Sequence, residues 1–192
     1  MQKKILVAVD GSPPSRQAVD YAGRMNDLIQ GLTVTLFHIQ PPVSQFLLDE
    51  AKRSGRAQTE LNKITARNAE ASRGLLASYR ETLLRAGLAE SAVELATRPH
   101  QQGLAKDILD YAQNGLFDAV LVGRRGISSI QQMFMGSVSA HLLENSPVIP
   151  VWLVDGDVRS TRVMAAVDGS ESALRAVDHM AFMLSGNPEV RF

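Results

Sequence analysis

Apolar, β-branched runs alternate with amphipathic stretches along most of the chain, and this alternation restricts the possible fold more than any other feature. The first run, Ile5–Val9, is continuously apolar and stops at Asp10. Such a run is typical of a strand that is buried on both faces, as in a parallel sheet. Pro13 and Pro14 suit the first turn of a helix, where no backbone N–H donor is needed. We expect Gly31 to end that helix.

The same pattern continues to about residue 154. The expected strands are Ile5–Val9, Leu32–Ile39, Val93–Ala96, Asp118–Val122 and Val148–Leu153. Helices are expected over residues 13–29, Thr59–Arg85, Leu104–Ala112 and Gly136–Glu144, where apolar residues recur at helical spacing. This order predicts an α/β fold: a five-stranded parallel, doubly wound, Rossmann-like sheet with helices on both faces. Pro150 has no N–H, so the last strand should lie at an edge or carry a bulge.

The segment from Gln40 to about Gln58 is harder to interpret. Pro41 and Pro42 break the preceding strand, and Phe46–Leu48 is apolar within a polar stretch. We expect a loop and a short helix that packs on the edge of the domain. A mobile flap over a ligand is the alternative.

The end of the chain repeats its beginning. Arg162–Ser170 parallels Lys4–Ser12 at a constant offset of 158 residues, so the chain contains the start of a duplicated domain. We expect residues 1–155 to form one domain, residues 156–160 a linker, and residues 161–192 an incomplete second copy. That copy should hold a strand, a helix and the start of another strand at Val190–Phe192. One βα unit cannot bury both faces of its strand, so we expect a truncated tandem protein. The alternatives are docking on the first domain or exchange with another copy of the chain.

The most specific motif is a pair of glycine signals in one strand-to-helix crossover. Gly123 and Gly126 follow an apolar strand, and Gly136-Ser137 follows after nine intervening residues, where a helix is expected to begin. Glycine lets a backbone approach a phosphate closely, and a helix start offers N–H donors and a positive dipole end. Ser137 and Ser139 add hydroxyl donors. Each signal alone is more often a turn or a cap, but their combination favours a phosphate site.

This spacing resembles the nucleotide-binding signature of the universal stress protein family. The opening strand with its Asp10-Gly11-Ser12 turn and the Ser146-Pro147-Val148 entry to the last strand are similar to that family as well. The resemblance implies a cytoplasmic protein of the ATP-binding class, with Mg²⁺ as the ion that would accompany the phosphates.

The resemblance also implies a role for each residue of the site. Asp10 would accept hydrogen bonds from the ribose, and the backbone of Ile39 would face the adenine. Arg124 departs from the family pattern, in which a small residue is common, and Arg124 and Arg125 would either assist a phosphate or be solvated. The residues expected to bind the nucleotide are Ala8, Val9, Asp10, Ile39, Gly123, Arg124, Gly126, Gly136, Ser137 and Val138.

Composition excludes several other classes of protein. Equal numbers of basic and acidic residues, 20 each, argue against a nucleic-acid binder. The absence of cysteine excludes disulfides, thiolate catalysis and Cys-ligated zinc. No segment approaches the roughly 20 apolar residues that span a membrane, and the first apolar run is too short for a signal peptide. His38, His100, His141 and His179 are scattered, so we expect no protein metal site.

These observations favour a binding module over an enzyme. The chain lacks a P-loop lysine motif and shows no set of nucleophile, base and orienting residue. We expect an ATP-binding module of the stress response. A slow ATP hydrolase and a dimeric scaffold without nucleotide are the alternatives. The apolar edge strand Val148–Val154 should pair with its counterpart in a homodimer.

Overall fold

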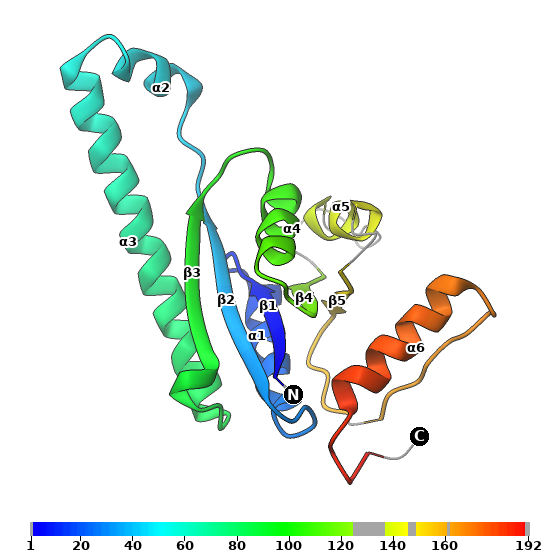
Figure 1. The fold of residues 1–192 in the computed structure, drawn as a ribbon. Coiled ribbons are helices and arrows are strands. Elements are labelled where there is room, and N and C mark those ends of the chain that lie inside the picture. Colours follow the sequence, from blue (N-terminus) through cyan, green and yellow to red (C-terminus); the bar gives the residue numbers. More distant parts are fainter. Residues whose placement is uncertain (1, 125–136, 146–148, 161, 191–192) are drawn as a thin grey trace.

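The computed structural model describes residues 2–124, 137–145, 149–160 and 162–190, and its centre is a parallel sheet in the order β3-β2-β1-β4-β5 (Figure 1). The strands are β1 (Lys3–Ala8), β2 (Leu32–Gln40), β3 (Val93–Pro99), β4 (Ala119–Gly123) and β5 (Val151–Val154). The helices are α1 (Pro13–Met25), α2 (Gln45–Ala51), α3 (Gly55–Arg85), α4 (Leu104–Asn114), α5 (Ser137–Asn145) and α6 (Glu171–Leu184), with a 3-10 turn at Glu90–Ala92. The predicted five-stranded parallel α/β fold is confirmed.

The central strand β1 is buried on both faces, which explains its unbroken apolar sequence. Ile5 and Val7 belong to the core that α1 and α3 cover, whereas Leu6 belongs to the core on the α4 and α5 face. All three side chains are fully buried. Alternate residues of a strand point to opposite faces, so a central strand between two helical layers needs apolar residues at every position.

Several elements end at other residues than the sequence predicts. Helix α1 stops at Met25, because Asn26 and Asp27 favour turns over helix, and the predicted extension to Ile29 is wrong. Strand β3 continues past Ala96 to Pro99, because the end of β2 offers it ladder partners. Strand β5 lies at an edge as predicted, but the described strand begins only after Pro150.

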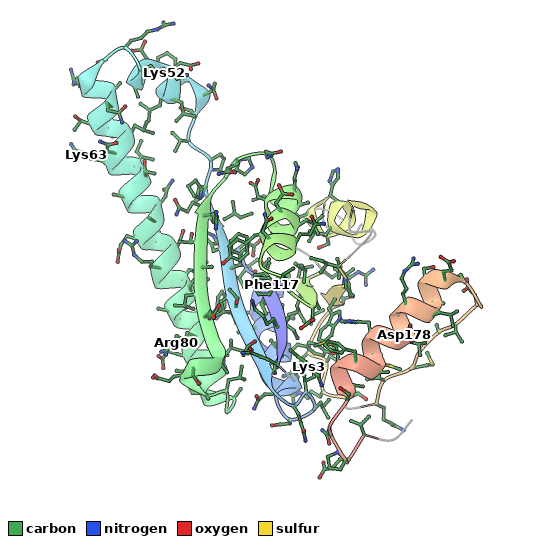
Figure 2. The ribbon with its side chains drawn as sticks, viewed as in Figure 1. Lys3, Lys52, Lys63, Arg80, Phe117 and Asp178 are labelled. Atoms are coloured by element: carbon green, nitrogen blue, oxygen red, sulfur yellow. The ribbon has the colours of Figure 1, made fainter. Side chains whose placement is uncertain are left out.

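The predicted short helix exists as α2, and it packs against α3. The buried residues of α3 all lie in its second half: Ser72, Leu76, Tyr79 and Leu83. The first half extends past the sheet together with α2 (Figure 1), and Lys52 and Lys63 lie on this projecting part (Figure 2). We refer to residues 45–70 as the arm.

The repeated segment forms its helix but not its strand. Helix α6 occupies the position in the repeat that α1 occupies in the first copy, and Ser170 caps it as Ser12 caps α1. Residues 162–168 are described, and none of them belongs to a strand. Val190 does not belong to a strand either, and residues 191–192 lie outside the described part. The expected βα unit is therefore incomplete because its strand has no neighbour in the sheet.

Helix α6 docks on the first domain. Met183 is 1% exposed and joins the core under α1 and α3. Trp152 of β5 donates a hydrogen bond from Nε1 to Nε2 of His179, at 3.0 Å. The buried Lys3 ammonium donates to the carbonyl oxygens of Met183 and Ser185, at 2.8 and 2.6 Å, where the end of α6 presents its negative dipole (Figure 2). Desolvation lowers the pKa of Lys3.

The docking of α6 predicts a selective effect of two substitutions on that helix. Met183→Ala should lower the free energy of undocking or unfolding by about 2–4 kcal/mol, as for other buried methionines. Leu174→Ala should have almost no effect, because Leu174 is 55% exposed. Trp152 is the single tryptophan and contacts α6, so its fluorescence during urea titration reports the change. Equal effects of the two substitutions would contradict the docking.

Candidate functional site

A hollow of about 110 Å³ lies at the carboxyl edge of the sheet, where the strand order reverses around β1. In doubly wound folds this is the place where ligands bind. Its walls come from the ends of β1, β2 and β4, the first turns of α1 and α4, and the start of α5. The hollow brings together six of the residues predicted from sequence: Ala8, Val9, Asp10, Ile39, Gly123 and Val138.

Asp10 is held by the first turn of α1. The N–H of Ser12 donates to Oδ1 of Asp10 at 3.0 Å, and the Ser15 hydroxyl donates to the same oxygen. Burial alone would raise the pKa of Asp10, but these hydrogen bonds outweigh it and hold the pKa below its usual value. Gly11 adopts a φ of 84°, which lets the chain reverse between β1 and α1. Asp10 is therefore an oriented carboxylate at neutral pH.

Gly123 allows β4 and α1 to approach each other closely. A Cβ at position 123 would overlap the backbone carbon and oxygen of Pro14. The φ of Gly123 is not in the left-handed region. The glycine is required here because the first turn of α1 occupies the space of a side chain.

Ser139 and Arg124 make contacts within the protein. The Ser139 hydroxyl, expected to serve a phosphate, donates to the carbonyl oxygen of Gly123 at 3.2 Å and ties α5 to the end of β4. Arg124 does not line the hollow, because its guanidinium pairs with Asp155. Ser137 begins α5. Gly126, Gly136 and Arg125 lie outside the described residues.

On β2, the side chain of His38 lies on one face of the sheet, and those of its neighbours Phe37 and Ile39 lie on the other. Phe37 and Ile39 line the hollow, whereas His38 Nδ1 lies 3.0 Å from the Ser72 hydroxyl on α3. Ser72 donates its proton to the carbonyl oxygen of Asn68, so His38 must be the donor in the first bond. Desolvation lowers the pKa of His38, and the charge of Asp10 opposes this effect. His38 is thus a structural link between the site strand and α3.

Seven further residues line the hollow that the sequence did not assign to the site. Phe37 is two residues before Ile39 and so shares its face, and Leu104 and Ile108 are one helical turn apart after the third strand. The serines and Pro14 follow from the capping of α1 at the carboxyl edge. These residues are Ser12, Pro14, Ser15, Phe37, Leu104, Ile108 and Val122.

No group of three or more His, Asp or Glu side chains in the described ranges could hold a metal ion. In that same part of the chain, no helix is long and apolar enough to cross a membrane.

These features define a doubly wound α/β protein with a hollow at the carboxyl edge of its parallel sheet. Residues 1–155 match the family described as the universal stress protein family, and the chain belongs to that family. A search of curated proteins found no match.

Solved structures share the fold at low sequence identity. A universal stress protein from Archaeoglobus fulgidus DSM 4304 matches with a TM-score of 0.70 and 19% identity, over 94% of this chain and 62% of that chain. A universal stress protein in complex with cAMP matches with a TM-score of 0.52 and 21% identity, over 80% of this chain and 96% of that one. An Archaeoglobus fulgidus universal stress protein in complex with dAMP matches with a TM-score of 0.51 and 17% identity, over 81% of this chain and 98% of that one.

The contact between Gly123 and Pro14 predicts that Gly123→Ala destabilises the protein. The added Cβ meets backbone and no flexible side chain, so we expect a loss of about 1–3 kcal/mol, typical of overpacking. Gly74→Ala is the matched control, because it lies inside α3 with no atom within 4 Å of the new Cβ. It should stabilise the helix by about 0.5–1 kcal/mol. Urea unfolding followed by circular dichroism measures both, and a neutral Gly123→Ala would contradict the close packing.

Proposed function

We propose that this chain is a cytoplasmic, ATP-binding universal stress protein that acts as a binding module in stress signalling. The observation that carries the proposal is the convergence of six of the predicted nucleotide-binding residues on one hollow at the carboxyl edge of the sheet. Relatives of the same fold are described in complex with cAMP and dAMP, which supports a site for an adenine nucleotide. Nucleotide occupancy would act by biasing the order or assembly of the chain.

The chemistry of the lining suits an adenosine. Phe37, Ile39 and Val122 supply apolar surface for a base, and the carboxylate of Asp10 can accept hydrogen bonds from ribose hydroxyls. The hydrogen bonds from Ser12 and Ser15 both end on Oδ1 of Asp10, so among the described residues Oδ2 keeps its lone pairs for an incoming hydroxyl. The hollow is smaller than the roughly 300–1,000 Å³ of a drug-sized pocket. It therefore fits part of a nucleotide, and the rest would extend over the edge.

The phosphates would lie toward the start of α5 and the glycine motif. Ser137 is the first residue of α5, whose N-terminus offers N–H donors to an anion. Gly123, Gly126 and Gly136 would allow the backbone to approach the phosphates, and the backbone of Val138 would contribute from the same turn. Arg124 would have to leave Asp155 to reach a phosphate, so we assign it no role while that ion pair is formed.

Mg²⁺ would bind chiefly through the phosphates and water. The described residues offer Asp10 as a carboxylate at this edge but no cluster of ligands that could hold a metal without nucleotide. When bound, the ion would neutralise phosphate charge. Asp10 is held by hydrogen bonds from Ser12 and Ser15, so we assign it to binding the nucleotide and not to catalysis. We therefore propose a binding module that does not hydrolyse ATP rapidly.

Calorimetric titration with ATP and Mg²⁺ tests the proposal. Asp10→Asn should weaken binding about tenfold or more, because the charge that strengthens the ribose hydrogen bonds is lost. Asp168→Asn is the matched control: Asp168 forms the same turn, with Gly169 at a φ of 83°, but lies in the repeat away from the hollow. It should leave the affinity unchanged. A flat titration of the natural sequence would favour the empty scaffold, and steady conversion of ATP to ADP would favour the hydrolase.

We also propose a homodimer through the edge strand predicted at Val148–Val154. Among the strands of the described residues, β5 pairs with β4 alone, and the carbonyl oxygens of Pro150 and Val154 point toward β4. By the alternation of a strand, the N–H groups of Val151 and Leu153 face outward and remain available for pairing.

Amide hydrogen exchange measured at several protein concentrations tests this dimer. Protection of the Val151 and Leu153 amides should increase with concentration, in parallel with the mass from light scattering. The amides of β3, at the opposite edge of the sheet, are the internal control and should not change. A monomer at high concentration, with constant protection at β5, would rule the dimer out.

A further inference from the structure

Residues 162–168 form an exposed apolar segment that repeats the sequence of the central strand. In β1, Ile5, Leu6 and Val7 are fully buried. Val163 and Met164, which correspond to Ile5 and Leu6, are 59% and 90% exposed. Val167, which corresponds to Val9, is 60% exposed. An uncovered run of apolar residues with β propensity is an interaction surface, because pairing would remove it from water.

The segment is held at both ends, although the structure gives it no ladder partner among the described residues. Before it, Asp157 pairs with Arg24 of α1 at 3.1 Å. After it, the N–H of Ser170 donates to Asp168 at 2.9 Å and starts α6, which is itself docked through Met183. A segment fixed at both ends loses little conformational entropy when it pairs, which favours association.

We propose that this segment pairs in antiparallel fashion with the same segment of a second copy of the chain. The sequence Arg-Val-Met-Ala-Ala-Val-Asp is complementary to itself when the two-fold axis passes through Ala165. In that register Arg162 of each copy lies opposite Asp168 of its partner, so an opposite charge pair closes each end. Val163 lies opposite Val167 on one face of the ribbon, and Met164 lies opposite Ala166 on the other.

The positions of the charged residues favour a second copy of the chain as the partner of this segment. Parallel pairing in register would place Arg162 opposite Arg162 and Asp168 opposite Asp168, which is unfavourable. The antiparallel register replaces both repulsions with attractions, and the small side chain of Ala165 allows the strands to meet at the axis. This interface does not depend on nucleotide binding.

Symmetric disulfide formation provides a direct test, because the chain has no cysteine of its own. Ala165→Cys places two thiols opposite each other across the axis. Directly opposed residues have Cβ atoms about 4.5–5.5 Å apart, close to the range that a disulfide requires. Under mild oxidation, we expect the A165C chain to form a linked dimer about tenfold faster or more than a control, because pairing raises the effective thiol concentration.

Two controls make the result specific. Ala89→Cys places an exposed thiol in the loop before β3, and it reports collision alone. Ala166→Cys shifts the thiol by one residue, so that it lies opposite Met164 and crosslinks more slowly than A165C. A rate for A165C equal to that of A89C would overturn the proposal, and faster linkage of A166C than of A165C would overturn the register.

A second measurement disrupts the ribbon and leaves the thiol at position 165 in place. Val163→Asp together with Val167→Asp places like charges opposite each other in the ribbon, and both positions are exposed, so the fold should be retained. Adding both substitutions to the A165C chain should reduce its crosslinking rate to that of the A89C chain, with the circular dichroism spectrum unchanged. An unchanged crosslinking rate would contradict pairing through this segment.

Discussion

The carboxyl edge of the sheet depends on one steric constraint: β4 must end in a residue without a side chain because the first turn of α1 lies against it. Gly123 meets this constraint, and Pro14 takes the space that a Cβ would fill. The contact brings the start of α1 under the end of β4, which in turn places Ser12 and Ser15 where they orient Asp10. Ser139 fastens α5 to the same point through the Gly123 carbonyl. The walls of the hollow therefore converge on one glycine.

This arrangement shows why the fold could be predicted from the sequence more fully than the site. The central strands can be recognised in the sequence because their side chains are buried on both faces of the sheet and are therefore continuously apolar. Ile5, Leu6 and Val7 of β1 are an example. The helix boundary at Met25 could not be located, since buried Ile29 continues the apolar spacing beyond the helix. At the site, the glycine motif predicted the edge of the sheet at which the hollow lies. The partners of Arg124 and Ser139 depend on tertiary distances that no local pattern encodes.

The repeat separates what local sequence determines from what requires a neighbour. Asp10 and Asp168 both accept a hydrogen bond from the N–H two residues ahead, at 3.0 and 2.9 Å, and the glycines between have φ values of 84° and 83°. The turn and the helix cap thus form in both copies. The strand forms only in the first copy, where β2 and β4 supply ladders on both sides. A repeated sequence therefore does not form a strand again unless neighbouring strands are present to pair with it.

The projecting arm has the geometry of a lever whose fixed end lies beside the site. The first buried residue of α3 is Ser72, and it is bonded to His38, the neighbour of Ile39 in the hollow. From this point the helix runs on for roughly 25 Å to Gly55, at 1.5 Å per residue. A tilt of about 5° at the pivot would displace the tip by roughly 2 Å over that length. A small adjustment around His38 is therefore magnified at α2, far from the sheet.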